Sequence, residues 1–294
     1  MLNLNQNIDR AVVEAFDKQI YKKSRVQLFV KRDDLIHNEI SGNKWRKLKG
    51  NLKAAQQSNC ETVATYGGAY SNHLLATACA GNEFNIKTKG YVRGQELNKE
   101  SNPILKRCSE LGMELLFISR KEYSECKGTN GVKVLNNGRT WYIPEGGANK
   151  EGVEGCKEIM RETSNDFDYV FVAQGTTTTS MGILSSLNVN TTLVVVPVLK
   201  GFDSLKEMSK MAQEFNLFYD ESRIIVLDEF HFGGYSKSNP VLNSFIEQFN
   251  KDQNFRIEAS YTGKVMFALN DFIRTEKLTN KKVLFVHTGG LYNG

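Results

Sequence analysis

Short runs of apolar, mostly β-branched residues alternate along the chain with longer stretches that have helical periodicity. Several of these runs are apolar nearly throughout, which is typical of strands covered on both faces of a sheet. The pattern predicts strands at Val26–Lys31, Thr62–Tyr66, Ile86–Val92, Glu114–Ile118, Thr140–Ile143, Tyr169–Ala173, Thr192–Val198, Ile224–Leu227 and Val283–Val286. It predicts helices at Lys44–Gln57, Ser71–Asn82, Asn102–Leu111, Lys150–Thr163, Thr178–Leu187, Ser204–Phe215, Val241–Asn250 and Lys264–Thr275.

Strands that alternate with helices predict an α/β protein whose sheets are joined by right-handed crossovers. The chain of 294 residues is long enough for two domains of about 100–200 residues each. Gly138 and the cluster from Pro144 to Gly147 interrupt the pattern, so we place a division near residue 145. We expect two open, twisted, mostly parallel sheets flanked by helices. The smaller domain would span 44–145, and the larger would combine 1–43 with 146–294.

Composition narrows the possible classes of protein. Hydrophobic residues make up 40% of the chain and charged residues 24%, as in ordinary globular proteins. The net charge of +5 is small and scattered, which argues against a nucleic-acid partner. The five cysteines form no CxxC pair, which favours the reducing cytoplasm over disulfides or a metal site. No apolar run approaches the ~18 residues that a membrane span requires, and no signal peptide is expected.

Lys44 is the strongest candidate for covalent chemistry. It follows Ser41-Gly42-Asn43 at the start of an expected helix, in the segment between the expected strand Val26–Lys31 and that helix. In open α/β sheets, ligands bind beyond the C-terminal ends of the strands, where such junctions lie. A lysine buried there can lose its proton by desolvation and form a Schiff base with a carbonyl compound such as pyridoxal phosphate. Taken alone, the residue barely outweighs an ordinary surface lysine.

A second junction has the chemistry of a phosphate site. Gly175 and four consecutive threonines follow an expected strand and open a helix. Free backbone N–H groups and threonine hydroxyls together suit a phosphate, while a capped turn is the equally common alternative. The chain has neither GxGxxG nor GxxxxGK[ST], so an oxidoreductase with a dinucleotide at this turn is a weak hypothesis.

Three further segments place polar groups where a ligand could meet them. In Gly67–His73, Ser71 is an expected N-cap beside an anion site that would suit a carboxylate, although a simple capped turn is more common. Tyr261 precedes a helix and would be an acid or a base only if its pKa were perturbed; packing is the commoner role. Thr288 follows the last expected strand and can hydrogen-bond a ligand.

Together these segments resemble the 1-aminocyclopropane-1-carboxylate deaminase and D-cysteine desulfhydrase family of fold-type-II pyridoxal phosphate enzymes. The similarity runs from about Leu28 to Leu291. It rests on Lys31-Arg32-Asp33-Asp34 with Ser41-Gly42-Asn43-Lys44, on Ser71-Asn72-His73, on Tyr261-Thr262-Gly263-Lys264 and on His287-Thr288-Gly289-Gly290. The family implies a homodimer, and a cofactor bound in the cleft between the two domains.

The resemblance also implies roles for individual residues. Lys44 would carry the cofactor and then remove the Cα proton, and Tyr261 would be an acid, a base or a nucleophile. Ser71 would hold the substrate carboxylate, and Asn72 would meet the ring hydroxyl of the cofactor. The substrate would be bound by Tyr70, Ser71, Asn72 and His73. The remaining cofactor contacts would come from Gly175, Thr176, Thr177, Thr178 and Thr179 at the phosphate and from Thr262 and Thr288 near the ring nitrogen.

The chain departs from the family pattern at three positions. Thr177 replaces a glycine of the phosphate loop, and Tyr70 replaces a glutamine. Thr262 replaces the glutamate of the deaminases, which predicts a neutral ring nitrogen and, within the family, chemistry like that of D-cysteine desulfhydrase. We therefore expect β-elimination from a small amino acid such as D-cysteine. The alternatives are 1-aminocyclopropane-1-carboxylate deamination and an inactive protein that only binds the cofactor.

Overall fold

The computed structural model describes residues 10–16, 24–37, 39–40, 42–135, 138–164 and 166–290. These residues form two compact units. The first unit holds the described part of 37–156, and the second unit combines 10–36 with 157–290. Ser41 of the lysine motif lies outside the described residues, as do both ends of the chain. Within the described ranges, no helix is long and apolar enough to cross a membrane.

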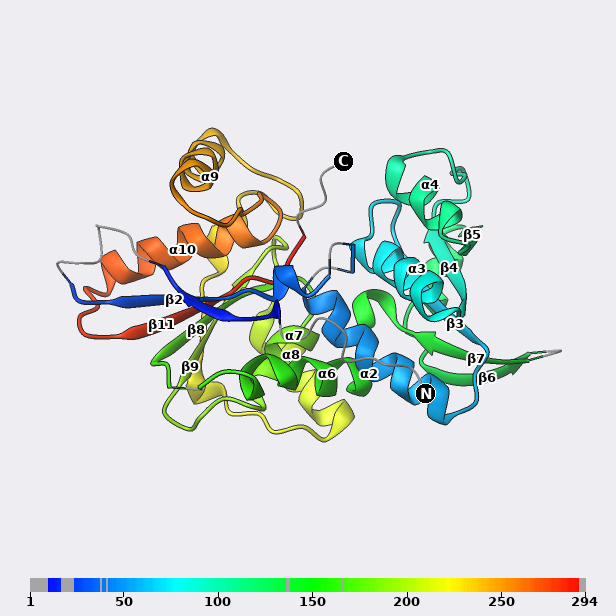
Figure 1. Ribbon diagram of the computed structural model, residues 1–294, viewed down its shortest axis with the longest axis horizontal. Coiled ribbons are helices and arrows are strands. Elements are labelled where there is room, and N and C mark those ends of the chain that lie inside the picture. Colours follow the sequence, from blue (N-terminus) through cyan, green and yellow to red (C-terminus); the bar gives the residue numbers. More distant parts are fainter. Residues whose placement is uncertain are drawn as a thin grey trace. The chain divides into compact units, whose positions relative to one another are not determined.

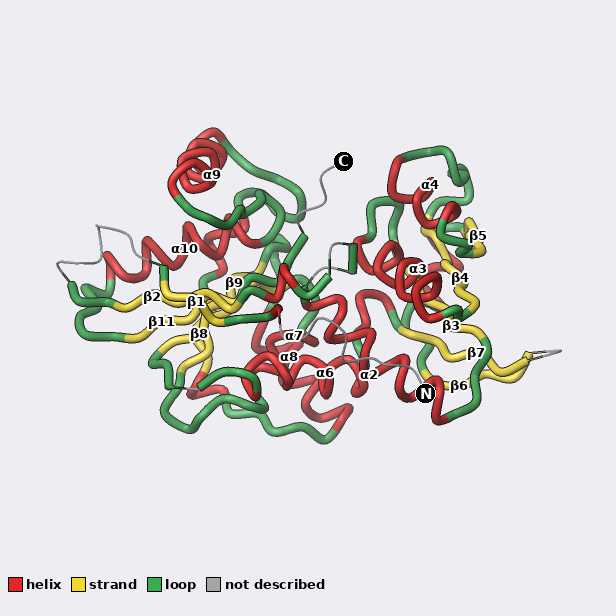
Figure 2. Tube along the Cα trace, viewed as in Figure 1, coloured by secondary structure: helices red, strands yellow, loops and turns green. Residues whose placement is uncertain are grey.

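The first unit is built on a five-stranded sheet (Figures 1 and 2). Its strands, in spatial order, are β5 (Glu114–Ile118), β4 (Lys87–Arg93), β3 (Thr62–Gly67), β7 (Gly138–Ile143) and β6 (Gly131–Leu135). All neighbours are parallel except β6, which pairs antiparallel with β7. The helices of this unit are α2 (Asn43–Gln57), α3 (Asn72–Phe84), α4 (Pro103–Glu110) and α5 (Arg120–Cys126), with a short turn η3 (Glu145–Gly147).

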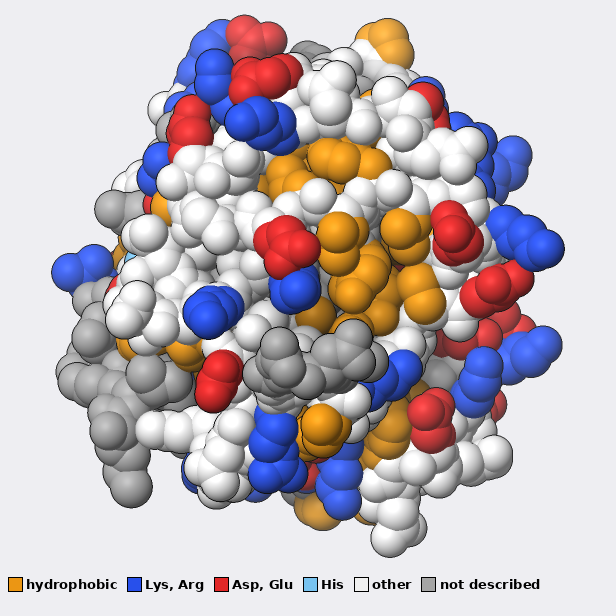
Figure 3. All heavy atoms as spheres, turned by 90° about the vertical axis from the view of Figure 1, so that its right-hand side faces the viewer, with side chains coloured by type: hydrophobic (Ala, Val, Ile, Leu, Met, Phe, Trp, Pro, Cys, Tyr) orange, Lys and Arg blue, Asp and Glu red, His pale blue; other side chains and the backbone are white. Residues whose placement is uncertain are grey.

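The two faces of this sheet are covered differently. Helix α3 packs against β3 and β4, and nine of its residues are buried. On the opposite face, the rings of Tyr66, Tyr91 and Tyr142 stack side by side, and Tyr123 of α5 meets Tyr66 edge to face. Figure 3 views the right-hand side of Figure 1, where β3, β4 and β5 are labelled, and hydrophobic side chains gather in the middle of that surface.

The second unit is built on a six-stranded sheet. Its strands, in spatial order, are β1 (Val13–Ala15), β2 (Gln27–Lys31), β11 (Lys282–Val286), β8 (Tyr169–Gln174), β9 (Thr192–Pro197) and β10 (Ile224–Val226). Only β1 runs antiparallel to its neighbour. The helices are α7 (Thr178–Leu184), α8 (Ser204–Phe215), α9 (Pro240–Asp252) and α10 (Thr262–Thr275), with short turns η2 (Asp33–Leu35), η4 (Glu221–Arg223) and η5 (Asp228–His231).

The apolar runs of the sequence form the core of the second unit. Alternate residues of β8, β9 and β11, such as Phe171, Val194 and Phe285, pack with Val265 and Leu269 of α10. Their neighbours in the same strands face the other way and are buried as well. The sheet lies between α10 on one face and α7 with α8 on the other (Figure 1). Strands covered on both faces explain why these runs are apolar throughout.

Helix α6 (Lys150–Arg161) begins in the first unit and ends in the second. Its first turns touch α2 backbone to backbone: a Cβ at Gly155 would stand 1.9 Å from the carbonyl oxygen of Arg46, and a Cβ at Gly50 would stand 2.1 Å from that of Glu151. This contact joins the start of α6 to the first unit. The unit therefore includes 37–43 and 146–156 in addition to 44–145.

The predicted α/β architecture with two mostly parallel sheets is confirmed, and each predicted strand and helix is present with small shifts at its ends. Among the described residues, the strands β1 and β6, the helix α5 and the short 3-10 helices η2, η3, η4 and η5 were not predicted. The strands β1 and β6 are short and pair antiparallel with their neighbours at the edges of the two sheets. Such edge strands are not marked by an apolar run in the sequence. The sequence of α5, RKEYSEC, is too polar for an apolar stripe, although its capping box of Ser119 and Glu122 was a usable signal.

Candidate active site

Lys44 lies in the first turn of α2, in the first unit. Gly42 is the N-cap residue and has φ of 60°, a conformation that glycine adopts without steric cost. The Nζ of Lys44 donates a hydrogen bond of 2.9 Å to Oδ1 of Asn43, and its side chain is only half-buried. The amine is therefore presented at the beginning of the helix, where a ligand can reach it.

Lys47 lies one helical turn further along α2, and sequence analysis assigned it no role. It is 2% exposed, and its Nζ donates a hydrogen bond of 2.9 Å to the carbonyl oxygen of Gly146 in η3. Burial lowers the pKa of this lysine to about 8. The spacing of three residues from Lys44 was the signal that could have identified it, because residues i and i+3 share a helix face.

His73 is buried beside these lysines. Neither ring nitrogen has a hydrogen-bond partner among the residues that the structure describes, although the side chain is only 2% exposed. Burial, followed by the charges of Lys47 and Lys44, holds its pKa well below the ordinary value, so the imidazole is neutral. The ring also reaches Gly147, where a Cβ would lie 3.3 Å from Cε1. Buried polar groups are normally paired, so these nitrogens fit a site that binds a polar ligand.

The turn after β3 holds the other predicted residues of the first unit. Ser71 is the N-cap of α3, as predicted, and its Oγ accepts a hydrogen bond of 3.3 Å from the backbone N–H of Leu74. A Cβ at Gly67 would lie 2.6 Å from Oγ of Ser71, so only glycine allows this close turn. Asn72 is the first residue of α3. Tyr70 is 67% exposed, which leaves its side chain mostly in solvent.

In the second unit, the Gly175 turn and Tyr261 lie against each other. A Cβ at Gly175 would stand 3.3 Å from Cε1 of Tyr261 and 3.8 Å from its hydroxyl oxygen. Thr178 and Thr179 are buried at the start of α7. Within the described part of the chain, the Oγ1 of Thr178 has no hydrogen-bond partner. The turn therefore offers a buried hydroxyl, and its glycine lets the backbone approach a ligand closely. Both features fit a phosphate.

Thr177 and Thr262 differ from Thr178 because their hydroxyls bind other parts of the second unit. Oγ1 of Thr177 donates to Sδ of Met211 over 3.4 Å. Oγ1 of Thr262 accepts from the backbone N–H of Glu258 over 3.0 Å and donates to Oε1 of the same residue over 3.2 Å. The hydroxyl of Thr262 thus takes part in capping α10.

Glu258 organises the beginning of α10, and sequence analysis missed it. Oε1 accepts hydrogen bonds of 2.9 Å from the backbone N–H groups of both Tyr261 and Thr262, and Oε2 accepts one from Ser260. A Cβ at Gly290 would lie 3.8 Å from Oε1, so the strand end that includes Thr288 approaches the same carboxylate. An acidic residue just before a helix was the available signal, since carboxylates favour helix N-termini.

Tyr235 is a second residue of this cluster that the sequence pattern did not reveal. Its ring meets that of Tyr261 at 5.6 Å between centroids, with an interplanar angle of 65°. Burial raises the pKa of Tyr261 well above its ordinary value, and the phenol of Tyr235 and the charge of Glu258 raise it further. Tyr261 therefore keeps its proton at neutral pH and can donate it.

The strand end after β11 has a mainly structural histidine. His287 is fully buried, with Nε2 2.6 Å from the carbonyl oxygen of Arg256, and its Nδ1 accepts a hydrogen bond of 3.2 Å from Gly289. These bonds fix the strand end and place Thr288, which is 6% exposed, directly after it. The second unit thus brings Gly175, Tyr261 and Glu258 together, and it places Thr288 on a neighbouring segment.

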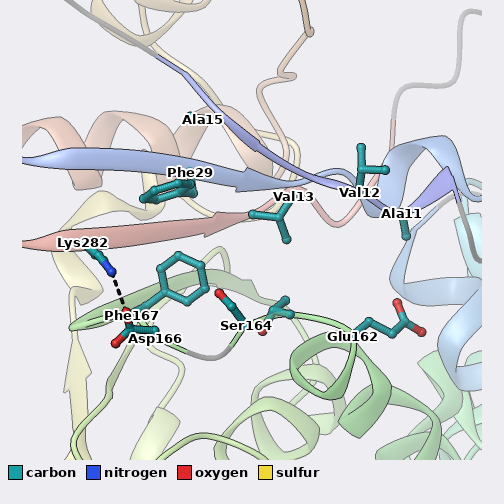
Figure 4. Close-up of a pocket in the computed structure, with 11 residues that line it drawn as sticks. Ala11, Val12, Val13, Ala15, Phe29, Glu162, Ser164, Asp166, Phe167 and Lys282 are labelled. Carbon is teal, nitrogen blue, oxygen red and sulfur yellow. Dashed lines mark hydrogen bonds and ion pairs between the residues drawn. The ribbon is translucent and has the colours of Figure 1, made fainter.

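A pocket of about 650 Å³ in the second unit lies apart from these residues (Figure 4). Val13 and Ala15 of β1, Phe29 of β2 and Phe167 line it, and Lys282 forms an ion pair with Asp166 at its rim. None of the predicted site residues lines this pocket. Among the described residues, no group of three His, Cys, Asp or Glu side chains is arranged to hold a metal ion.

Comparison with known proteins agrees with the fold. The family model described as pyridoxal-phosphate dependent enzyme matches residues 16–289. The chain belongs to this family of enzymes, whose cofactor is pyridoxal phosphate. The orphaned ring nitrogens of His73 and the orphaned hydroxyl of Thr178 fit such a polar, phosphorylated group.

Individual relatives place the chain within the family. It is 28% identical to a Thermotoga maritima protein provisionally assigned as a 1-aminocyclopropane-1-carboxylate deaminase, over 94% of this chain and 93% of that protein. It is 29% identical to the Arabidopsis thaliana bifunctional D-cysteine desulfhydrase/1-aminocyclopropane-1-carboxylate deaminase, over 90% of this chain and 72% of the relative. A solved structure of an ACC deaminase homologue superposes with a TM-score of 0.77 at 24% identity, over 96% and 89% of the two chains.

Proposed function

We propose that this pyridoxal phosphate enzyme deaminates a small amino acid by β-elimination. The preferred substrate is D-cysteine, which with one water gives pyruvate, ammonia and hydrogen sulfide. Two observations support this choice: the Arabidopsis relative bears this activity in its name, and the chain has Thr262 where a glutamate would favour ring opening. The observation that carries the proposal is Lys44 at the beginning of α2, one helical turn before the buried Lys47.

Lys44 is the proposed attachment point of the cofactor and the base that takes the Cα proton. Pyridoxal phosphate supplies the electron sink that stabilises the resulting carbanion. The protein must bind the substrate, orient its Cα–H bond and accept the proton. A lysine amine near another cationic group is a recurrent way to keep a lysine reactive, and Lys47 provides that charge on the same face of α2.

Ser71, Asn72 and His73 are the proposed binding groups for the substrate carboxylate and the ring hydroxyl. Ser71 accepts from Leu74 through its oxygen, so its own hydroxyl proton is available for donation. The neutral imidazole of His73 has one donor and one acceptor, neither of them paired within the described residues. Tyr70 is proposed to contact the substrate from the exposed end of the turn.

Gly175, Thr176, Thr177, Thr178 and Thr179 are the proposed phosphate site. The support for it is the buried, unpaired Oγ1 of Thr178. Thr177 would contribute its backbone N–H, because its hydroxyl is directed at Met211. Thr262 and Thr288 are the proposed neighbours of the ring nitrogen, with Thr288 the better placed to donate a hydrogen bond because Thr262 is engaged with Glu258.

Tyr261 is the proposed proton donor to the leaving group. A buried phenol that keeps its proton can donate a hydrogen bond to the departing sulfur, and groups that act as general acids contribute about 10²–10⁴-fold to a rate. The raised pKa of Tyr261 argues against its acting as a phenolate nucleophile at neutral pH.

The test of the central claim is the absorbance spectrum of the purified protein with pyridoxal phosphate, before and after borohydride. Wild type should show a visible band that borohydride removes, and Lys44→Ala should not. Lys53→Ala is the matched control, because Lys53 is an exposed lysine of the same helix. A wild type without a reducible band, or a Lys44→Ala protein that keeps it, would reject the claim.

Product analysis decides the substrate. Incubation with D-cysteine should release pyruvate and sulfide, and 1-aminocyclopropane-1-carboxylate should release little 2-oxobutanoate. The names of the relatives keep deamination of the cyclopropane as the second candidate, and vigorous ring opening would defeat the interpretation of Thr262. A reducible band without keto acid from any amino acid would identify a binder that has lost turnover.

Three wider expectations are also proposals. The enzyme is proposed to be a homodimer, to act in the cytoplasm, where its scattered cysteines stay reduced, and to hold its cofactor mainly through the larger domain, 1–43 with 146–294. Light scattering of the purified protein tests the first of these. A mass of one chain, near 33.2 kDa, would refute it.

A further inference from the structure

The loop before Tyr235 has an unusual backbone. Phe232, Gly233 and Gly234 have φ values of 50°, 95° and 117°, and Ser236 has φ of 53°. Residues other than glycine rarely adopt the left-handed backbone conformation, because their Cβ then approaches the following carbonyl oxygen. Such conformations persist where surrounding contacts impose them, and they gather at functional sites.

Lys264 supplies contacts of this kind. It is the third residue of α10 and is fully buried. Its Nζ donates hydrogen bonds of 2.8 Å to the carbonyl oxygen of His231 and 2.7 Å to that of Gly234. These two carbonyls flank Phe232 and Gly233, so one ammonium group holds both ends of the left-handed stretch. Burial lowers the pKa of Lys264 to about 8, and the nearby charge of Glu258 opposes that shift.

Tyr235 follows Gly234 directly, so the position of its ring depends on this stretch. The ring contacts Tyr261 edge to face, and the phenol of Tyr235 helps to raise the pKa of Tyr261. Tyr261 in turn lies against the Gly175 turn. A continuous series of contacts therefore runs from the ammonium of Lys264 through Tyr235 to the phenol of Tyr261.

We propose that Lys264 is a positioning residue for the reaction: its ammonium fixes the loop from His231 to Gly234, so that Tyr235 holds the phenol of Tyr261 in place. Its importance for turnover rests on the proposed function of Tyr261. The positional part stands by itself, because it concerns contacts within the second unit. A purely structural lysine would support only the stability of the fold.

The test compares Lys264→Met, Tyr235→Phe and the double variant with wild type. Methionine keeps most of the side-chain length and removes the donors. The first readout is a pH titration of tyrosine absorbance, with Tyr261→Phe used to assign the signal of Tyr261. In both single variants Tyr261 should titrate at lower pH than in wild type. Hydrogen exchange at Gly233, Gly234 and Tyr235 should quicken in Lys264→Met.

The second readout is kinetic and uses whichever substrate wild type turns over. Lys264→Met should lower kcat by roughly 10²-fold with a smaller change in KM, because a small displacement of a catalytic group has effects of this size. The double variant should lose little more than Lys264→Met, because residues that act through one another are not additive. Lys251→Met, on the exposed side of α9, is the matched control and should resemble wild type.

The outcomes separate the two proposals. If wild type releases no keto acid, the proposed function fails, while the titration and the exchange still test the role of Lys264. If Lys264→Met only lowers the unfolding temperature and leaves the titration of Tyr261 and kcat unchanged, the positional role is refuted. Should Lys264→Met not fold, Lys264→Gln and Tyr235→Phe carry the same measurements. Unchanged titration of Tyr261 in both would overturn the proposal.

Discussion

The two units hold polar clusters of contrasting chemistry. The first unit brings together Lys44, Lys47 and His73, a pair of amines beside an imidazole that burial keeps neutral. The second unit brings together hydroxyl and carboxylate groups, with Tyr261, Tyr235 and Glu258 joined by ring contacts and hydrogen bonds. Amines suit covalent attachment and proton removal, whereas a fixed phenol suits proton donation.

The cluster around His73 in the first unit and the cluster around Glu258 in the second also differ in how completely their polar groups are paired. In the first unit, both nitrogens of His73 are buried without a partner. In the second unit, Glu258 accepts from three backbone N–H groups, and Thr262 bonds to it twice. Paired groups are held in position before a ligand arrives, and preorganised groups stabilise developing charge most effectively. The comparison predicts that substitutions in the Glu258 cluster change the orientation of catalytic groups. Substitutions in the His73 cluster should change the local charge and the binding of ligands.

The largest effect is expected from Tyr261→Phe. Loss of the buried hydroxyl should lower kcat by about 10²–10⁴-fold, because the variant keeps the ring but cannot donate a proton. Steady-state kinetics with D-cysteine measures it. Tyr219→Phe is the control, since that hydroxyl bonds to the backbone of Leu205 and to Glu221. An unchanged kcat in Tyr261→Phe would show that Tyr261 of the second unit is not the proton donor.

A smaller effect, on stability, is expected from Gly155→Ala in the first unit. The added methyl would meet the carbonyl oxygen of Arg46 at 1.9 Å, so α2 and α6 must separate. Overpacking of this kind costs roughly 1–3 kcal/mol of the free energy of unfolding, measurable by urea titration. Gly128→Ala should change stability by less than about 0.5 kcal/mol, since nothing lies within 4 Å of a Cβ there. Equal stability of the two variants would contradict the close contact.

The last effect, which is small near neutral pH and grows above pH 8, is a change of slope with pH in Lys47→Met. Burial lowers the pKa of Lys47 from 10.5 to about 8, so the folded chain binds this proton less tightly than the unfolded chain. Both proteins are compared without cofactor. The free energy of unfolding of wild type minus that of the variant should therefore rise with pH above about 8. The expected rise is roughly 1 kcal/mol per pH unit until the ordinary pKa is reached. Parallel pH profiles would show that Lys47 is not desolvated.

Particular residues show how far sequence reasoning reached. The buried strands β8, β9 and β11 were predicted because a strand covered on both faces must be apolar at every position. Ser71 was predicted as an N-cap because its hydroxyl can replace a missing backbone partner. Tyr235 and Lys264 were not assigned roles, because each acts on a ring or a backbone segment that lies far away in the sequence. Glu258 was missed although its partners are only two to four residues away.

The sequence by itself determined the α/β class, the order of its elements and the junctions that carry Lys44, Ser71, Gly175 and Tyr261. These features are local: they follow from periodicity, capping and the strand-to-helix turns. Only the tertiary structure decided which polar groups are already paired and which are not. Thr177 and Thr178 are neighbours of the same type, yet one hydroxyl meets Met211 and the other has no partner. Hydrogen bonding and desolvation depend on segments that folding brings together, and so do the pKa values of Lys47 and His73.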